Sequence, residues 1–484
     1  MLILGLNAFH ADAAAALVDA ESGRLLAATA EERINRVKHY AGFPELAIRE
    51  CLEIAGAKAA DVAHVAIARD AKANLLAKLG FTLKNLPRIG QMARQRLERR
   101  ADIASIPELL QKSLGPSAAP KVHRVEHHLA HLASTFLVSP FDSAALLSID
   151  GFGDFASTMS GHGSGTDIRI FDRTLFPHSL GIVYTAVSQF IGYDRYGDEG
   201  KVMGLAPYGK DDYREFFDKL VRFEPEGRIR LDLDWFVHHV EGVDYSFDGS
   251  GRPTVAPLYS SKFAERFGPP RKHGEELTPR DMNLARSLQA SLERAYFHML
   301  NHLAERTKET RLCLAGGVAL NSVANGLVID HTPFKELYIQ PAAGDDGAAI
   351  GAAYWTLHNG LKQPRKFVME SAATGKAYSA AECETALKAA GVEYRRHEEA
   401  DLLRESAKLI ATGKVVGWFQ GRMEWGPRAL GNRSILAHPG YPGMKDILNA
   451  RIKHREWFRP FAPVVLEEKI GEYFERTHPS PHML

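Results

Sequence analysis

The alternation of apolar and polar positions near the N-terminus predicts a β-hairpin. Residues 2–7 are apolar, residues 8–12 form a polar turn that contains His10 and Asp12, and residues 13–18 are apolar again. Two apolar runs separated by a short polar turn are typical of two paired strands. We therefore expect the chain to begin with a hairpin that carries His10 and Asp12 at its tip.

The same pattern returns in the middle of the sequence. Residues 144–149 are apolar, residues 150–154 form a turn that begins with Asp150, and residues 156–159 continue as a strand. Such an internal echo predicts a duplicated α/β unit with a cleft between the copies. Small residues at these turns let backbone N–H groups approach a phosphate, and an aspartate there can hold a metal ion or a water. An Asx-capped hairpin explains either turn equally well when it is considered alone.

A helix is predicted between the two hairpins, over residues 126–136. This stretch contains no Gly or Pro and is rich in Leu and Ala. In a helix, His127 and His131 lie four residues apart on one face, so both imidazoles can reach one ion. His128 points about 100° away from them. Solvated histidines on a polar helix face are the alternative, and the surrounding residues must decide between the two.

A glycine pair marks a predicted anion or nucleotide site. The apolar strand 312–315 leads into Gly316 and Gly317, and residues 318–321 open a helix that includes Asn321. A strand, a glycine pair and a helix N-terminus together suit an anion. The spacing matches neither the dinucleotide-binding fingerprint nor a P-loop.

Two further polar segments are candidates for ligand contacts. A strand over residues 336–339 is followed by Asp345, which sits where a loop meets the start of a helix and is equally well explained as a helix cap. Residues 198–209 are Gly-rich and contain Lys201. This composition predicts a loop that lines a ligand, and a simple connecting loop is the alternative.

The last quarter of the sequence has a different pattern. Residues 361–378 are rich in Pro, Lys and Gly and are predicted to be a linker, and a second domain of helices and strands follows. Guanidinium groups on Gly-rich turns can bind phosphate in a bidentate manner. A merely basic surface is the alternative. The arginines concerned are Arg422, Arg428, Arg433, Arg455 and Arg459.

Composition narrows the class of protein. A chain of 484 residues predicts at least two domains, and its 45% apolar and 25% charged residues are ordinary for a soluble globular protein. The net charge of +1 gives no general attraction to nucleic acid or membranes, and we favour a solvated face over a nucleic-acid arm for the basic stretch 84–100. Three distant cysteines, no basic leader and no apolar run near roughly 20 residues predict a soluble cytoplasmic protein.

The donor types restrict the metal that the histidine pair could bind. Imidazoles combined with carboxylates suit iron, manganese or zinc better than calcium or magnesium, which prefer all-oxygen shells. Asp150 and Asp345 are the candidate carboxylates for this site. His10 and Asp12 are candidates for a base or an orienting group.

Six motifs in chain order resemble the O-carbamoyltransferase family, which includes the nodulation-factor, tobramycin, novobiocin and cephamycin enzymes. The fifth motif is highly specific. The motifs are His127-His128-x-x-His131-x-Ala133-Ser134, Ile149-Asp150-Gly151, KVMGLAPYG at 201–209, AGGVALN at 315–321, GRMEWGPRALGNRS at 421–434 and REWFRPFAP at 455–463.

The resemblance implies an α/β fold in two parts. Residues 1–360 would form a TsaD-like domain with the duplicated actin/Hsp70/sugar-kinase-like fold, and residues 379–484 an α+β YrdC-like domain. The YrdC-like domain would convert carbamoyl phosphate and ATP, with Mg²⁺, into carbamoyl adenylate and would release phosphate and pyrophosphate. The TsaD-like domain would pass the carbamoyl group to a hydroxyl of a small-molecule acceptor, either a natural product or a sugar.

The resemblance also implies roles for single residues. Fe²⁺, or Mn or Zn, would be held by His127, His131, Asp150 and Asp345. The adenylate would lie at the Gly316–Gly317 loop, with Lys201 and Asn321 as further nucleotide contacts, and the five arginines would bind carbamoyl phosphate and ATP. His10 or Asp12 would take the proton of the acceptor hydroxyl. Several members have a histidine directly before the aspartate, where this chain has Ala11.

Other expectations concern the chain end and rival functions. Family members continue past residues 480–484, which predicts a truncated second domain with an exposed sheet edge and weak carbamoyl adenylate synthesis. Rival functions are a nucleotide- and metal-binding partner protein, a tRNA threonylcarbamoyl-transfer protein and a sugar kinase; the near-neutral charge speaks against tRNA. The irregular segment 212–280 is expected to shape the acceptor pocket, and no nucleic-acid or membrane partner is expected.

Overall fold

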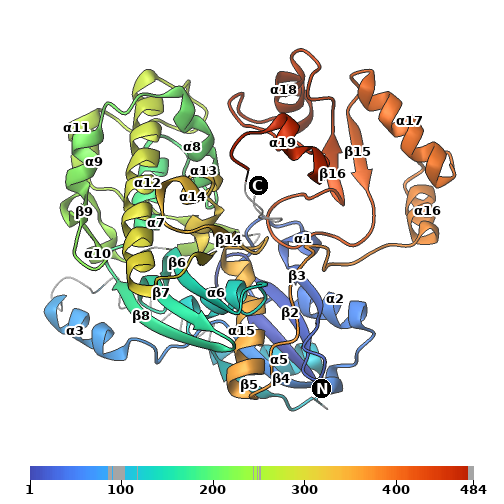
Figure 1. Cartoon of the computed structure of the whole chain (residues 1–484), viewed down its shortest axis with the longest axis horizontal. Coiled ribbons are helices and arrows are strands. Elements are labelled where there is room, and N and C mark those ends of the chain that lie inside the picture. The colour runs from blue at the N-terminus through green and yellow to red at the C-terminus, as the bar shows by residue number, and fades with distance from the viewer. Residues whose placement is uncertain are drawn as a thin grey trace. The chain divides into compact units, whose positions relative to one another are not determined.

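Two compact units make up the chain: Met1–Glu370 forms unit 1 and Ser371–Thr477 forms unit 2 (Figure 1). The boundary between them falls within residues 361–378. The computed structural model describes residues 1–85, 90, 104–116, 118–243, 245–247, 249 and 252–477. Most of the basic stretch 84–100, and the chain end at 480–484, lie outside these described residues.

The first sheet of unit 1 contains the predicted N-terminal hairpin. Strand β1 pairs antiparallel with β2 and parallel with β4, so the strand order is β3-β2-β1-β4-β5. Every residue of β1 is buried, as expected for a central strand covered on both faces. The strands are β1 Leu2–Asn7, β2 Ala14–Asp19, β3 Leu25–Ala30, β4 Val62–Ile67 and β5 Lys121–Arg124.

The second sheet repeats this arrangement. Strand β6 pairs antiparallel with β7 and parallel with β13, and the order β8-β7-β6-β13-β14 matches the first sheet strand for strand. The repeat confirms the predicted duplicated α/β fold. The strands are β6 Ser143–Gly153, β7 Ala156–Ser164, β8 Asp167–Leu175, β13 Arg311–Ala315 and β14 Glu336–Tyr338.

Two buried helices lie in the middle of unit 1, between the two sheets (Figure 1). Helix α6, His127–Phe136, packs against α15, Ala348–Trp355, and α15 also packs against β1. Two glycines allow this close approach. A Cβ atom at Gly351 would overlap the carbonyl of Ala130, and one at Gly5 would overlap the carbonyl of Ala349. The α6–α15 pair therefore fixes the position of the histidine helix.

The remaining helices of unit 1 cover the sheets. Helix α12 spans Pro279–Thr307 and starts with a Thr278–Asp281 capping box. The other helices are α1 Glu32–Asn35, α2 Glu45–Ala55, α3 Leu75–Asn85, α5 Ile106–Leu114, α7 Leu180–Phe190, α13 Ser322–Gly326 and α14 Val328–His331. Of the helices in the described part of the chain, none is long and apolar enough to cross a membrane.

The prediction of a loop at residues 198–209 is wrong. Residues Glu199–Leu205 form helix α8, and Ala206–Tyr208 form the 3-10 turn η3. The glycines misled the prediction, because Gly200 lies inside the helix and Gly209 serves packing. A Cβ atom at Gly209 would overlap the Met282 carbonyl, so this glycine lets η3 lie against α12.

The prediction that the segment 212–280 is irregular is also wrong, because short helices and strands form within it. Its short elements surround a cluster of rings formed by Phe190, Phe216, Trp235 and Phe263, and this aromatic packing substitutes for long regular elements. The elements are α9 Arg214–Leu220, β9 Val221–Phe223, β10 Ile229–Leu231, η4 Leu233–Trp235, α10 His238–Glu241, β11 Tyr245–Phe247, β12 Pro253–Val255 and α11 Ser261–Phe267.

Unit 2 combines a two-stranded antiparallel sheet with several helices. The buried apolar residues among its described positions are Ala372, Trp425, Met444, Leu448 and Phe458. The YrdC-like assignment and the predicted truncation of this domain stay predictions. The elements are α16 Ala380–Ala389, α17 Glu399–Ala411, β15 Val416–Phe419, β16 Arg433–Leu436, α18 Met444–Ile447, the π-helical turn η8 Leu448–Lys453 and α19 Ile470–Tyr473.

Candidate metal centre and phosphate-binding arginines

Helix α6 presents two imidazoles to the same point in unit 1. Its first turn is held by Glu126, whose side chain accepts the Leu129 N–H at 2.7 Å. His127 and His131 are 2% and 0% exposed, which rules out solvated histidines. Their Nε2 atoms lie 3.0 Å apart, as the four-residue spacing predicted.

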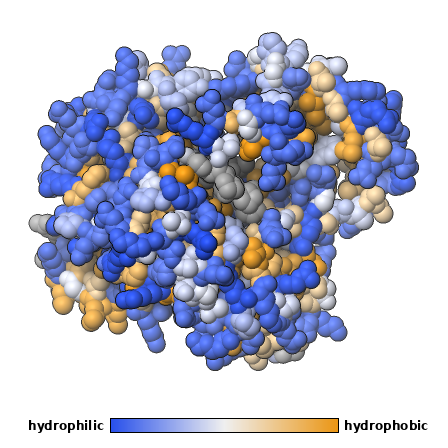
Figure 2. Space-filling view, in the orientation of Figure 1, coloured by the Kyte–Doolittle hydropathy of each residue, from blue (hydrophilic) through white to orange (hydrophobic). Residues whose placement is uncertain are grey.

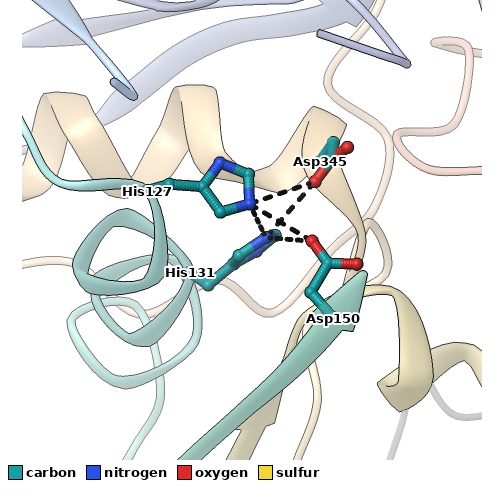
Figure 3. A group of neighbouring side chains, drawn as sticks. All are labelled: His127, His131, Asp150 and Asp345. Atoms are coloured by element: carbon teal, nitrogen blue, oxygen red, sulfur yellow. Dashed lines mark hydrogen bonds and ion pairs between the residues drawn. The ribbon is translucent and has the colours of Figure 1, made fainter. Parts of the chain in front are cut away.

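Two carboxylates complete this group (Figure 3). Asp150 Oδ2 lies 3.2 Å from His127 Nε2 and 3.3 Å from His131 Nε2. Asp345 Oδ1 lies 3.5 Å and 3.3 Å from the same two atoms. The four potential ligand atoms all lie within 4.8 Å of one another. The structure thus brings together the four residues that the sequence singled out as metal ligands.

Sheet topology explains why residues so distant in sequence meet. Strands β6, β13 and β14 are parallel, so their carboxyl ends lie at one edge of the second sheet. Asp150 lies near the end of β6, and Asp345 follows β14. Helix α6 follows β5, which is the corresponding position in the first sheet. The edges of the two sheets therefore supply the ligands.

Each carboxylate is oriented by its second oxygen. Asp150 Oδ1 accepts the N–H groups of Gly151 at 2.8 Å and Gly317 at 3.2 Å. Asp345 Oδ2 is hydrogen-bonded to His10 Nδ1 at 2.6 Å. Such outer partners fix metal ligands in place. The buried Asp345 Oδ1 has no hydrogen-bond partner, so the oxygen that faces the imidazoles is the one left for an ion.

The electrostatics of the group favour a cation. Burial raises the pKa of Asp150, but hydrogen bonds from His127 and His131 outweigh it and bring the pKa well below its usual value. The pKa of Asp345 is lowered in the same way against burial, chiefly by His10. Both carboxylates are therefore ionised at neutral pH. Burial also lowers the pKa of His131, but the hydrogen bond with Asp150 and the negative charges of Asp150 and Asp345 raise it to about 10.

His128 lies outside this group, as the helical geometry predicted. Its Nδ1 is 2.8 Å from Ser148 Oγ, and the side chain is fully buried. Burial, together with the neighbouring imidazoles of His127 and His131, lowers the pKa of His128 to about 3, so this ring is neutral.

The structure separates His10 from Asp12. His10 contacts Asp345 and is 29% exposed, whereas Asp12 Oδ1 is 2.7 Å from His39 Nδ1. The His39 backbone N–H donates to Glu32 at 2.7 Å, so Asp12, Glu32 and His39 form a second polar group. No role was predicted for Glu32 and His39. Their place after β3, beside the hairpin tip, was the available signal.

The predicted nucleotide contacts are largely engaged within the protein. The Gly316 N–H donates to Ala343 O, and the Gly317 N–H donates to Asp150. Asn321 caps α13 through the Ala324 N–H and pairs with the Gln289 amide. Lys201 forms an ion pair with Asp198 at 2.9 Å. Binding of a nucleotide by these four residues stays a prediction.

Backbone carbonyls of unit 2 hold two of the five predicted phosphate-binding arginines, Arg422 and Arg433, and accept one hydrogen bond from a third, Arg455, whose Nη2 donates to Pro460 O at 3.1 Å. Arg422 donates to Gly375 O at 2.9 Å and also to Thr374 O. Arg433 donates to Gln420 O at 2.6 Å, and its guanidinium lies 3.6 Å from the centre of the Phe419 ring. Both side chains fasten the Gly-rich motif to its neighbours.

The other three arginines lie close together. Desolvation and the charge of Arg459 lower the pKa of both Arg428 and Arg455. Glu456, 3.5 Å from Arg459 Nη1, is the nearby acid. Arg428 has no hydrogen-bond or ion-pair partner within the described residues. Three crowded guanidinium groups with one acid suit a polyanion.

Glu424 shapes the loop that carries Arg428, a role that the sequence analysis missed. Its Oε1 accepts the backbone N–H groups of Leu430 at 2.9 Å, Asn432 at 2.7 Å and Arg433 at 3.0 Å. Burial raises the pKa of Glu424, but these hydrogen bonds outweigh it and hold the pKa below its ordinary value of 4.5. A glutamate inside an Arg- and Gly-rich motif was the signal for such a loop anchor.

Glu424→Gln is expected to lower the free energy needed to open this loop by about 1–2 kcal/mol at pH 7, because the charged hydrogen-bond acceptor is lost. Amide hydrogen exchange of residues 430–433 measures the effect. A lowered carboxylate pKa contributes stability above its ordinary value, and that contribution is lost as the pH falls through the folded-state pKa. At pH values below about 4.5, the amides of residues 430–433 in the wild-type protein should therefore be less protected from hydrogen exchange. The variant should show no such loss of protection. Glu405→Gln on the exposed face of α17 is the control; equal exchange in the two variants would contradict the role.

Comparisons with known proteins add an independent result. Family models described as Carbamoyltransferase N-terminus and Carbamoyltransferase C-terminus match residues 2–354 and 407–484. An uncharacterized protein of Synechocystis sp. is 39% identical over 100% of this chain and 78% of its own length. Nodulation protein NolNO of Sinorhizobium fredii is 37% identical over 97% of this chain and 64% of its own. Nodulation protein NolO of Bradyrhizobium diazoefficiens is 38% identical over 72% of this chain and 60% of its own length.

Similarity to solved structures is weaker. Component A of the (R)-2-hydroxyglutaryl-CoA dehydratase of Acidaminococcus fermentans covers 75% of this chain with 99% of its own, at a TM-score of 0.39 and 13% identity. HypF of T. kodakarensis covers 75% of this chain with 48% of its own, at a TM-score of 0.35 and 13% identity.

Proposed function

The chain belongs to the carbamoyltransferase family, and from this premise we propose that it transfers a carbamoyl group from carbamoyl adenylate to a hydroxyl of a small molecule. The convergence of His127, His131, Asp150 and Asp345 at one point, beside the Gly316–Gly317 turn, is the observation that carries the proposal. The matched relatives support carbamoyl transfer in general. The adenylate, the metal and the acceptor are the parts that we propose.

The four converging residues are proposed to hold Fe²⁺, with manganese or zinc as alternatives. Two imidazole nitrogens and two carboxylate oxygens form a donor set that these ions accept. Asp150 and Asp345 each turn one oxygen inward and have the other fixed by a neighbour, which is the arrangement expected of metal ligands. When bound, the ion would polarise a carbonyl or phosphoryl oxygen.

Unit 2 is proposed to make the carbamoyl adenylate. Hydrolysis of carbamoyl phosphate gives carbamate and phosphate; a carbamate oxygen then attacks the α-phosphorus of ATP, and pyrophosphate leaves. Carbamoyl phosphate and ATP are both polyanions, and ATP is expected to bind together with Mg²⁺. Arg428, Arg455 and Arg459 are the residues proposed to bind the phosphates of these reactants, because their positive charges are crowded together.

Unit 1 is proposed to carry out the transfer. The acceptor oxygen forms a bond to the carbamoyl carbon, the bond from that carbon to the adenylate oxygen breaks, and AMP leaves. His10 is proposed to take the hydroxyl proton, because Asp345 orients its ring through Nδ1 and the side chain is partly exposed. Asp12 is the less favoured base, since its carboxylate is already hydrogen-bonded to His39.

The experiment that tests this proposal measures pyrophosphate release from ATP with and without carbamoyl phosphate. We expect release only when both are present, and transfer of labelled carbamoyl to members of a panel of hydroxylated acceptors. A protein that binds nucleotide and metal but releases no pyrophosphate would instead be a non-catalytic partner. Release that ignores carbamoyl phosphate would exclude the adenylate route.

A further inference from the structure

A cavity of about 350 Å³ lies in unit 1, away from the metal-ligand group. It is bounded by the end of α3, the β9–β10 hairpin and the segment Pro177–His178. Figure 1 shows α3 at the lower left, with β9 and α10 above it. Its volume is in the range of small-molecule sites. We call this cavity the cationic pocket, for the side chains described next.

Three cations line the pocket, namely Lys84, Arg222 and Arg230, and Asp232 is the one carboxylate among its lining residues. Asp232 lies 3.6 Å from Arg222. Lys84 and Arg230 have no hydrogen-bond or ion-pair partner in the part of the chain that is described. The pocket therefore carries an uncompensated positive charge.

The positions of the two arginines make this charge costly without an anion. Arg222 and Arg230 are directly opposite each other on the antiparallel strands β9 and β10. Like charges at such a cross-strand pair destabilise the hairpin. A phosphate between them would remove the repulsion and would accept several charge-assisted hydrogen bonds.

Apolar and neutral polar groups complete the walls. Phe81, Pro177, Leu231 and Leu233 give an apolar surface, which suits the hydrocarbon face of a sugar ring. His178 Nδ1 accepts the Leu231 N–H at 3.2 Å, which leaves Nε2–H as a neutral donor on the wall. Outside the pocket, α3 carries exposed leucines, and Figure 2 shows hydrophobic surface at the lower left, where Figure 1 places this helix.

Residues next to the pocket wall pack beside Asp150. Ser179, the residue after His178, donates its hydroxyl to the backbone carbonyl of Asp150 at 3.0 Å. Phe81 lies 5.0 Å from Phe176, ring centre to ring centre, and Phe176 lies 5.0 Å from Phe152. Phe152 is two residues from Asp150. These contacts link the pocket wall to the strand that carries Asp150.

We propose that the cationic pocket binds a sugar-like alcohol that carries a phosphate group. This inference goes beyond the proposed carbamoyl transfer, because it assigns a separate ligand site in unit 1. The phosphate is held by Lys84, Arg222 and Arg230, and the sugar face lies on the apolar wall. The segment 212–280, which was expected to shape the acceptor pocket, supplies β9 and β10 to it.

Calorimetric titration of the full chain tests this inference without ATP or carbamoyl phosphate. The probes are glucose 1-phosphate, inorganic phosphate and glucose. We expect the sugar phosphate to bind most tightly, phosphate more weakly and glucose not measurably. Arg230→Gln and Lys84→Gln should each weaken binding of glucose 1-phosphate roughly tenfold or more, because each removes a charge-assisted contact.

A matched control lies on the same hairpin. Arg228 is exposed, pairs with Glu226 at 3.1 Å and does not line the pocket, so Arg228→Gln should leave binding unchanged. Loss of affinity in Arg228→Gln equal to that in Arg230→Gln would show a diffuse charge effect and overturn the inference. Absence of saturable binding by both phosphate probes, or equal affinity for phosphate and the sugar phosphate, would also overturn it.

Pyrophosphate release separates this inference from the proposed function. Arg230→Gln should release pyrophosphate at the wild-type rate, since the pocket is not the proposed site of adenylate formation. If the wild-type protein binds the sugar phosphate but releases no pyrophosphate, the function fails and the pocket stands. If release is normal and binding is unchanged in both pocket variants, the pocket assignment fails alone.

Discussion

His131→Ala is expected to remove the bound metal and abolish carbamoyl transfer while the fold of unit 1 persists. The Nε2 atom of this residue lies within 3.3 Å of His127, Asp150 and Asp345, so its loss leaves three of four ligands. Changes to outer partners of a ligand already cost about 10–100-fold in metal affinity, and loss of a ligand should cost at least about 100-fold. Metal content after desalting, followed by the rate of transfer, measures the effect.

His128→Ala is the matched control for this prediction. Both imidazoles are fully buried, lie on the same helix and leave a cavity of the same size, but His128 is bonded to Ser148 and faces away from the carboxylates. Both variants should lose similar thermal stability, because the cavity cost is shared. Only His131→Ala should lose metal. Equal metal content in the two variants would show that the histidine pair is structural.

The histidine pair illustrates what local sequence spacing can predict. Helical periodicity alone places His127 and His131 on one face and turns His128 away, and the structure agrees. Asp150 and Asp345 lie at the same sheet edge because β6 and β14 both run parallel to β13, and no local pattern contains that information. Both were candidates because each lies in a turn after a predicted strand, and the family resemblance then implied that they bind a metal together with the histidines.

Other features escaped prediction for physical reasons that can be named. Strand β5, Lys121–Arg124, has mostly polar residues, so it lacks the apolar pattern on which strand prediction depends. Helix α8 was read as a loop because Gly200 is unfavourable in a helix, yet buried Val202 and Leu205 outweigh that propensity. Tertiary packing decides both cases.

The arginines show the same limit for side chains. Motif and composition treat Arg422, Arg428 and Arg433 alike, but their roles depend on which acceptors lie within reach. Arg422 and Arg433 find backbone carbonyls that need donors, whereas Arg428 does not. A guanidinium group that is already satisfied by carbonyls contributes rigidity, and an unsatisfied one among other cations is available for a ligand.

Arg428→Gln is therefore expected to lower pyrophosphate release by about 10²-fold, the cost of losing one charged donor to a transferring phosphoryl group. The metal content of unit 1 should not change, because its ligands all lie in Met1–Glu370. Steady-state pyrophosphate release at varied carbamoyl phosphate and ATP measures the loss. A rise in KM for one substrate alone would identify the phosphate that Arg428 contacts.

Two comparisons make this result decisive. Arg404→Gln removes a guanidinium from the exposed face of α17, where it pairs with Asp401, and should leave the rate unchanged. Arg433→Gln should loosen the motif that contains Arg428, so it should lower the rate together with the protection of nearby amides from hydrogen exchange. Arg428→Gln should lower the rate while that protection stays intact. If both variants lose amide protection, Arg428 acts through loop structure, and phosphate binding by the crowded arginines is contradicted.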